Sequence, residues 1–146
     1  MTDFTLSLIP PSDPQLRNAL VFASLPTHDL EDDGCSFFAL RDSVGAVVGY
    51  SGLEVYGDDV LLRSMVIQPE RRGEGIGRTL AELTIAKAAP GADVYLATTS
   101  AAPFFKTIGF DEVGRSYLPT AVLFTRQLSS LCPASATIMK LKRPPI

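Results

Sequence analysis

The chain has 146 residues, 46% of them hydrophobic and 20% charged, with a formal net charge of −3. This composition is typical of one globular domain with its own core, and the negative charge argues against a nucleic-acid partner. The sequence has no apolar run of membrane-spanning length and no basic leader region, and two cysteines and one histidine are too few for a disulfide scaffold or a conventional zinc site. We therefore expect a cytoplasmic protein with free thiols, no metal and no membrane partner.

The first half of the chain predicts a strand, a helix and then three strands. The helix begins at Ser12-Asp13-Pro14, where a capping side chain precedes a proline at the first helical position, and Pro26 ends it. Gly57-Asp58-Asp59 predicts a hairpin turn between the last two strands, and Pro69 stops the last one. The expected strands cover residues 4–9, 37–41, 47–56 and 60–67.

The second half predicts a glycine-rich turn followed by alternating helices and short strands. The helix expected at 76–88 carries Ile76, Leu80, Leu83 and Lys87 along one side, and Pro90-Gly91 ends it. The other expected elements are strands at 94–98, 111–116 and 137–142, and helices at 101–108, capped by Gly109, and at 120–128. This order predicts a single α/β (α+β) domain over residues 1–146, with a mixed central β-sheet flanked by helices.

The segment Arg71-Arg72-Gly73-Glu74-Gly75-Ile76-Gly77-Arg78 lies between a predicted strand and a predicted helix. Its alternate glycines leave backbone N–H groups bare at the positive end of a helix dipole, which suits a phosphate. A Walker P-loop needs four residues between its glycines and then a lysine, whereas Gly73 and Gly77 enclose three and Arg78 follows. A dinucleotide fingerprint needs two residues between its second and third glycines, whereas Gly75 and Gly77 enclose one. Both nucleotide motifs fit poorly.

The remaining interpretation is the acetyl-coenzyme A loop of the GNAT N-acetyltransferases, a family that the chain resembles from about Val47 to Phe110. Residues 72–77 match the Arg-x-x-Gly-x-Gly signature, residues 65–69 match the preceding strand end, and residues 104–110 match the downstream helix that ends in Gly-Phe. A tight turn without a ligand is the alternative for the glycines. The resemblance implies a GNAT-like fold, transfer of an acetyl group from acetyl-coenzyme A to a small-molecule amine by direct attack, and often a homodimer.

A narrower resemblance covers residues 52–57, 61–64 and 124–136, which look like a subgroup of GNAT proteins found with arsenic-resistance genes. It implies a link to resistance against arsenic or another toxic compound and leaves the substrate open. Cys132 alone makes a poor trivalent arsenic site, and we interpret it as a small buried apolar residue. The predicted helix at 120–128 is an alternative wall for the acceptor pocket, which would then be small and partly dry.

The resemblance also implies where the cofactor binds. The pyrophosphate would lie on the backbone amides of residues 72–78, with Arg78 adding a cationic contact. Pantetheine would pair with the backbone at Met65 and Ile67, where a family-typical bulge would supply an oxyanion donor worth about 3 kcal/mol. The implied cofactor-binding residues are Met65, Val66, Ile67, Arg72, Gly73, Glu74, Gly75, Ile76, Gly77, Arg78, Thr98, Phe104 and Phe105.

Glu54 is the first candidate for the base that deprotonates the amine, because the family often draws a carboxylate from this region. Neutralising an amine with a pKa of about 10.4 at pH 7 costs roughly 4–5 kcal/mol, so a base that acts directly or through water is useful. Counting around the hairpin puts Glu54 opposite Leu62 or Arg63, and the second register would make a cross-strand ion pair. Both interpretations stay open, with Arg63 positioning Glu54 or binding an acidic substrate.

The chain lacks the residue that usually serves as the general acid in this family. Many GNAT enzymes have Tyr just after the aromatic at Phe104, whereas this chain has Phe105. Thr99, Ser100, Tyr117 or water can substitute for that hydroxyl, although Ser and Thr after a strand are more often helix caps. A thiol with a pKa of about 8.5 also makes a tolerable thiolate leaving group without an acid.

Two other classes of function compete with a small-molecule acetyltransferase. A non-catalytic acyl-coenzyme A binder or sensor is favoured by Phe105. Acetylation of protein lysines would prefer an open acidic groove, for which the sequence offers little support. His28 lies in a Pro-Thr-His-Asp turn that we expect to be exposed, with no catalytic role.

Overall fold

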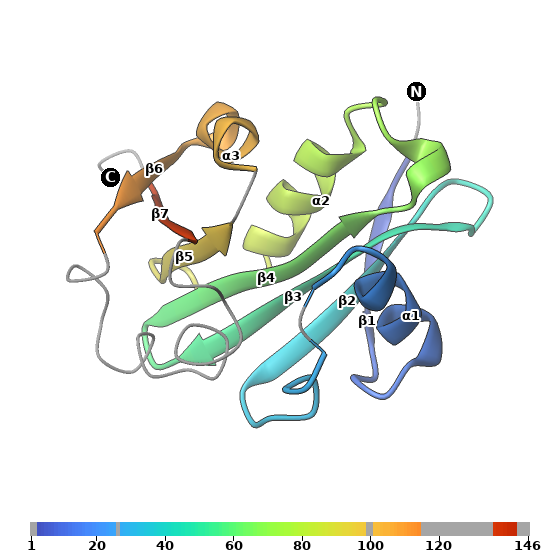
Figure 1. Ribbon diagram of the computed structural model, residues 1–146, viewed down its shortest axis with the longest axis horizontal. Helices are drawn as coiled ribbons and strands as arrows, with labels where there is room; N and C mark the ends of the chain where they lie inside the picture. Colours follow the sequence, from blue (N-terminus) through green and yellow to red (C-terminus); the bar gives the residue numbers. More distant parts are fainter. Residues whose placement is uncertain (1–2, 26, 99–100, 115–135, 143–146) are drawn as a thin grey trace.

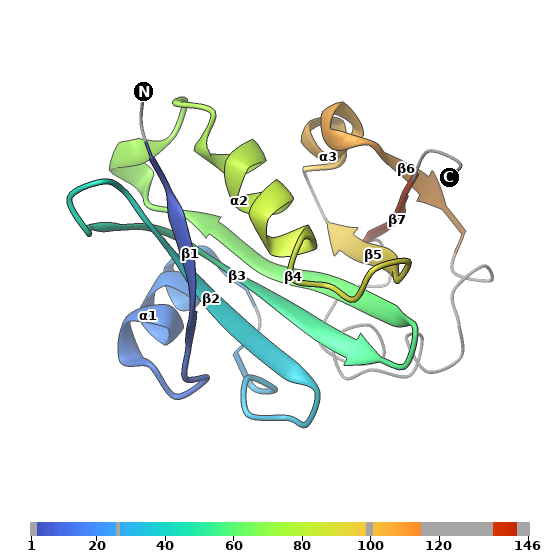
Figure 2. The ribbon, with the colours of Figure 1, turned by 180° about the vertical axis from the view of Figure 1, so that it is seen from behind.

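The structure, a computed structural model, describes residues 3–25, 27–98, 101–114 and 136–142. The strands are β1 (Thr5–Ile9), β2 (Cys35–Arg41), β3 (Val47–Tyr56), β4 (Asp59–Ile67), β5 (Asp93–Thr98), β6 (Phe110–Val113) and β7 (Thr137–Leu141). The helices are α1 (Pro14–Phe22), the 3-10 turn η1 (Pro69–Arg71), α2 (Ile76–Ile85) and α3 (Ala102–Ile108). The strands form one mixed sheet in the order β1-β2-β3-β4-β5-β7-β6, and helices cover both faces (Figures 1 and 2). The predicted fold is confirmed.

Helix α1 begins at its predicted cap. The Asp13 carboxylate accepts hydrogen bonds from the backbone N–H groups of Gln15 at 2.8 Å and Leu16 at 3.3 Å. Leu16 and Leu20 are fully buried, so the helix packs its apolar side on the sheet. Figures 1 and 2 show α1 on one face of the sheet and α2 on the other.

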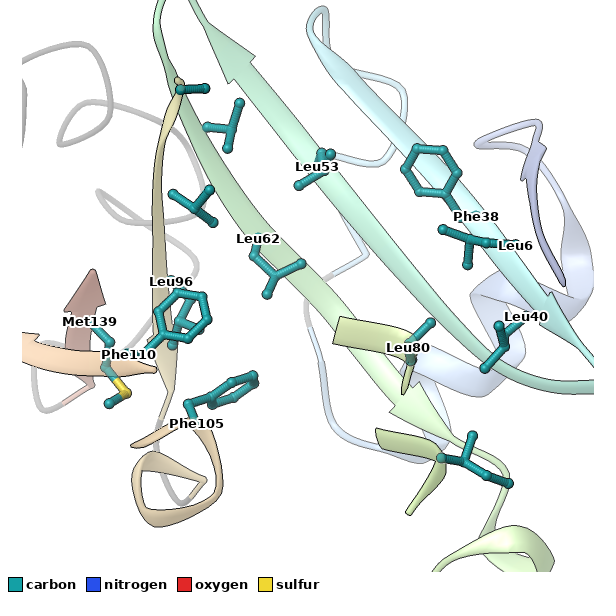
Figure 3. Close-up of a cluster of buried hydrophobic side chains, with 14 of the residues drawn as sticks. Leu6, Phe38, Leu40, Leu53, Leu62, Leu80, Leu96, Phe105, Phe110 and Met139 are labelled. Carbon is teal, nitrogen blue, oxygen red and sulfur yellow. The ribbon is translucent and has the colours of Figure 1, made fainter. Parts of the chain in front are cut away.

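Alternate residues of the strands supply the two larger of three hydrophobic clusters among the described residues, one on each face of the sheet. On β2, Phe38 and Leu40 belong to the cluster beneath α2 and α3, whereas Phe37 and Ala39 belong to the cluster beneath α1. Figure 3 shows the first cluster, which extends across the sheet to Met139 on β7. This larger core therefore connects both halves of the sheet.

Helix α2 is shorter than predicted, because it ends at Ile85 rather than Ala88. After this point the backbone N–H groups of Lys87 and Ala88 bond to carbonyls three residues earlier, in a tighter turn. The buried side consists of Ile76, Leu80, Ala81 and Thr84. Of the four residues predicted along one side of this helix, the first two are buried, whereas Leu83 is half-buried and Lys87 is exposed.

The strand predicted at 111–116 begins one residue earlier, at Phe110, and ends at Val113. Gly109 adopts φ of 118° directly before it and ends α3 as predicted. The helix predicted at 120–128 lies outside the described residues.

The hairpin between β3 and β4 determines the register near the candidate site. Tyr56 pairs with Asp59, so the turn consists of two residues rather than the three assumed from the sequence. Glu54 consequently lies opposite Leu61, and the predicted pairing with Leu62 or Arg63 is wrong.

A bulge interrupts β4 three residues before its end. The pairing with β3 loses register between Tyr50 and Gly52, so that Ser64 and Met65 together face Ser51. Ser64 has φ of 57°, in the left-handed region that costs a non-glycine residue roughly 1–2 kcal/mol. A bulge of this kind bends its strand and increases the local twist. The family-typical bulge expected in this strand is therefore present.

Strands β4 and β5 pair in parallel only at their beginnings. The ladder joins residues 59–61 of β4 to residues 93–95 of β5, and the two strands then separate (Figure 1). The later part of β4 keeps its pairing with β3 as far as Ile67. The sheet is therefore split along one line that begins after Leu61, in the first half of β4.

Candidate functional site

A cavity of about 1210 Å³ lies at the split between β4 and β5. Its walls come from residues 62–67 of β4, residues 96–98 of β5, the glycine-rich loop, the start of α2, and α3. Because β4 and β5 no longer pair here, their facing backbone edges are available to an extended ligand that pairs like a strand.

Most of the residues predicted to bind the cofactor line this cavity. They are Met65, Val66, Ile67, Arg72, Gly73, Gly75, Ile76, Gly77, Arg78, Thr98, Phe104 and Phe105. Glu74 is absent from the described lining, and its carboxylate instead forms an ion pair with Arg71 at 3.2 Å. Ser100, the low-ranked catalytic candidate, lies outside the described residues, as do Thr99, Tyr117 and Cys132.

The three glycines of the loop have two different tasks. Gly73 and Gly75 adopt φ of 85° and 76°, and a side-chain carbon added to either would meet nothing within 4 Å. They are therefore required by the left-handed backbone. A side-chain carbon on Gly77 would lie 3.1 Å from the Phe104 ring, so this glycine allows α3 to approach α2. Together they leave the N-terminus of α2 open towards the cavity.

Arginines surround the loop end of the cavity. Arg71 forms an ion pair with Asp42 at 2.9 Å, and this hydrogen bond raises the pKa of Arg71 above its ordinary value. Arg78 donates to the Thr107 carbonyl at 3.3 Å, and Arg72 is exposed at the rim. Carboxylates balance much of this charge, since Arg71 is paired with Asp42 and Arg78 also pairs with Glu82 at 3.4 Å. The loop end therefore offers guanidinium N–H donors to an anionic ligand.

A buried ionic cluster adjoins the bulge and is centred on Arg63, in the middle of β4. The Arg63 guanidinium binds both oxygens of Asp29, at 2.5 and 2.6 Å, and Oε1 of Glu54 at 3.2 Å. Tyr56 donates its hydroxyl to Oε2 of Glu54. Burial opposes the charge on Arg63, but the hydrogen bonds and charge of Asp29 outweigh it, so the pKa of Arg63 lies above its ordinary value. Of these four residues, Arg63 is the one that lines the cavity.

Glu54 and Arg63 therefore form the ion pair that the sequence left open, in a diagonal arrangement. Arg63 lies opposite Gly52 and two positions from the partner of Glu54, so both side chains share one face. The Glu54 side chain is only 3% exposed and meets the cavity through Arg63. Its assignment as the base stays a prediction.

Cys35 adjoins the same cluster, with its sulfur 3.8 Å from Nη1 of Arg63. Burial, followed by the charge of Glu54, raises the pKa of the Cys35 thiol to about 12. The thiol therefore stays protonated at neutral pH, and no disulfide includes it.

Sequence reasoning missed the contribution of the connection between α1 and β2. Residues 23–25, 27 and 28 line the cavity, and Asp29 holds Arg63. His28 is exposed, as expected, but it lies on the cavity wall. Asp29 is separated from Arg63 by 34 positions and belongs to an acidic, turn-like run, so no local pattern distinguishes it from a solvent-exposed carboxylate.

Phe105 is part of the core and of the cavity wall. It is 8% exposed and makes edge contacts with Phe104 and Phe110, at ring separations of 5.1 and 5.7 Å. Figure 3 shows it reaching from α3 towards β4. The Thr98 hydroxyl accepts a hydrogen bond from the Ala101 backbone N–H at 3.0 Å, in the turn before α3.

Over the described part of the chain, no group of three His, Cys, Asp or Glu side chains is placed to hold a metal ion. The described helices are also too short or too polar for any of them to cross a membrane.

The family profile of the acetyltransferase (GNAT) domain matches residues 32–112, more than half of the chain. The chain belongs to the GNAT acetyltransferase family. This match contains β4, the glycine loop, α2, β5 and α3, which supply most of the cavity wall. The lining residues 23–25, 27, 28 and 136 lie outside it. No curated protein sequence matches this GNAT chain.

Solved structures support the same fold at low sequence identity. A GNAT acetyltransferase from Staphylococcus aureus has a TM-score of 0.70 at 18% identity, covering 95% of this chain and 98% of its own. N-acetylglutamate synthase from Neisseria gonorrhoeae, in complex with coenzyme A and N-acetyl-glutamate, has a TM-score of 0.74 at 16% identity. That match covers 97% of this chain and 36% of the synthase. A variant of spermidine N-acetyltransferase from Vibrio cholerae has a TM-score of 0.65 at 16% identity, covering 94% of each chain.

Proposed function

We propose that this GNAT protein transfers the acetyl group of acetyl-coenzyme A to the amine of a small molecule by direct attack. The observation that carries the proposal is one continuous cavity that joins the glycine loop to the split between β4 and β5. Such a cavity offers N–H donors for phosphates at one end and a backbone edge for an extended chain. When bound, acetyl-coenzyme A supplies an activated acetyl thioester.

The residues that line the cavity lie in the order in which the parts of acetyl-coenzyme A would meet them. Gly73 and Gly75 leave open space above the N-terminus of α2, where a pyrophosphate can accept backbone hydrogen bonds. Met65 and Ile67 would offer their backbone to the pantetheine amides, and the bulge at Ser64 lies one residue further back. In this order the reacting carbonyl would lie at the bulge.

The amine must lose a proton, and we propose that water in the cavity takes it. In this scheme Glu54 is a positioning residue that helps Asp29 hold Arg63, since its own oxygens are occupied by Arg63 and Tyr56. Direct proton transfer to Glu54 is the alternative kept from the sequence. The two roles differ in their dependence on pH, because a base matters less as more of the amine becomes neutral.

The proposal is tested by titrating the protein with acetyl-coenzyme A in a calorimeter and then following thiol release with a panel of amines. We expect binding, and release of coenzyme A only when an amine is present, with the acetylated amine identified by mass spectrometry. Hydrolysis without an amine, or an absence of binding, would reject an acetyltransferase of this design.

A non-catalytic acyl-coenzyme A sensor is the second candidate, because Phe105 stands where many relatives carry a tyrosine hydroxyl. Phe105→Tyr separates the two functions. If the protein is a sensor that lost its acid, the wild type should bind without turnover and the variant should gain turnover. If it is an enzyme, the wild type should already release thiol.

Three further expectations stay proposals: a cytoplasmic location, a homodimer and a link to arsenic resistance. The last rests mainly on residues 124–136, of which the structure describes Ala136.

A further inference from the structure

Ser64 combines an unusual backbone with a place on the cavity wall. Its φ of 57° lies in the left-handed region, which serine rarely adopts. Strained residues of this kind are concentrated at functional sites, because the surrounding structure must hold them in place. Ser64 is 8% exposed and lines the cavity where β4 separates from β5. The bulge therefore presents a serine hydroxyl close to where the thioester is proposed to lie.

The Ser64 hydroxyl is oriented by the buried ionic cluster. Nε of Arg63 donates a hydrogen bond to Oγ of Ser64 at 3.2 Å. The oxygen acts as an acceptor in this contact, which leaves its proton to donate elsewhere. Arg63 itself is held by both oxygens of Asp29 and by Glu54, so the cation beside the hydroxyl has a fixed position. A fixed cation strengthens the hydroxyl as a hydrogen-bond donor.

We propose that the Ser64 hydroxyl donates a hydrogen bond to the thioester carbonyl oxygen and stabilises the negative charge that develops there. The proposal rests on the proposed function and adds a catalytic residue to it. Asp29 and Arg63 are then positioning residues, since they act on the substrate only through Ser64. This arrangement gives a second oxyanion donor beside the backbone amide expected at the bulge, and it gives the strained serine a function.

Transfer of the acetyl group to the amine needs no proton from Ser64. The neutral amine nitrogen forms a bond to the carbonyl carbon, and the carbonyl electron pair moves to the oxygen that Ser64 faces. When the carbonyl re-forms, the carbon–sulfur bond breaks and coenzyme A leaves as a thiolate. Water takes one proton from the nitrogen, and the thiolate acquires a proton from solvent. Ser64 keeps its proton throughout.

The test uses Ser64→Ala and Ser64→Gly in the full chain. Both remove the hydroxyl, but glycine also relieves the left-handed strain, so loss of activity in Ser64→Gly cannot come from a strained or unfolded bulge. Ser36→Ala removes a hydroxyl from β2, outside the described cavity lining, and is the matched control. Removing an oxyanion donor typically lowers kcat by on the order of a hundredfold. We expect that loss in both Ser64 variants, with an unchanged Kd for acetyl-coenzyme A.

A second measurement needs no turnover. The infrared carbonyl band of isotope-labelled acetyl-coenzyme A should lie at lower wavenumber when bound to the wild type than when bound to either Ser64 variant. Identical bands, or kcat values within about twofold of the wild type, would overturn the role of Ser64. A shifted band in a wild type that acetylates no amine would support the hydrogen bond and reject the proposed function instead.

Discussion

The buried cluster contains one cation, Arg63, and two carboxylates, Asp29 and Glu54. Arg63 and Asp29 have side chains that are 1% exposed and make two short hydrogen bonds, whereas Glu54 makes one longer contact to Arg63. Removing one partner of a buried ion pair typically costs 3–5 kcal/mol, because it leaves the other charge unpaired. Asp29 should therefore contribute more to stability than Glu54.

The variant Glu54→Gln separates a positioning role from a base. We expect the free energy of unfolding to fall by about 1–3 kcal/mol, since Arg63 loses one charged partner and keeps the other. We also expect kcat to fall by a similar factor at neutral pH and at pH about 9, since Glu54 takes no proton. Denaturant unfolding and a pH–rate profile measure the two effects. A loss that disappears at high pH would identify Glu54 as the base.

The variant Asp29→Asn should lower the free energy of unfolding by more than Glu54→Gln does, by about 3–5 kcal/mol. Its matched control is Asp33→Asn, an exposed carboxylate in the same connection, which should change stability by less than about 0.5 kcal/mol.

At the scale of elements, the shape of the glycine loop depends on the backbone conformation of Gly73 and Gly75 and on packing at Gly77. The open space around the first two positions is where the proposed pyrophosphate would lie. A side chain at Gly75 would therefore have two effects: strain in the loop, and loss of space for the ligand.

Gly75→Ala and Gly45→Ala distinguish those effects. Gly45 also has a left-handed backbone, with φ of 87° and open surroundings, but it lies in the turn between β2 and β3, outside the described cavity lining. Each variant should lose about 1–2 kcal/mol of stability from strain. Only Gly75→Ala should also weaken coenzyme A binding, by about tenfold or more, in a calorimetric titration. Equal affinities for the two variants would reject the placement of the pyrophosphate.

Across the whole molecule, one core connects the two parts of the split sheet. Leu62 on β4 and Leu96 on β5 lie in the cluster that α2 and α3 cover, together with Phe105 (Figure 3). Strands β4 and β5 can therefore diverge while the core on the α2 and α3 face still joins the two parts of the sheet. An extended ligand in the split would complete the hydrogen bonding of the sheet.

Binding of acetyl-coenzyme A should consequently stabilise the molecule and protect one region of its backbone. At a ligand concentration of 100 times Kd, the expected gain is about 2.7 kcal/mol, which a thermal melt detects. In hydrogen exchange, the amides of residues 62–67 and 96–98 should become slower, whereas those between β1 and β2 should change little at their already paired positions. Protection confined to α1 would contradict the proposed binding path.

Most elements and the cofactor loop could be predicted from neighbouring residues. Asp13-Pro14 begins α1, Gly109 ends α3, and β3 covers the predicted residues, because capping, steric limits and strand preference act over a few positions. The glycine spacing argued against the two nucleotide loops for the same reason, since the freedom of φ at glycine is a local property.

The tertiary structure alone decided what surrounds the reacting group. A two-residue turn placed Glu54 opposite Leu61, and a bulge placed Ser64 on the cavity wall. A shift of one residue in the turn would have given Glu54 a different partner. Asp29 meets Arg63 across 34 positions of sequence. Charges compensate one another according to distance in space, so a buried ionic cluster has no signature in the order of residues until the sheet brings its members together.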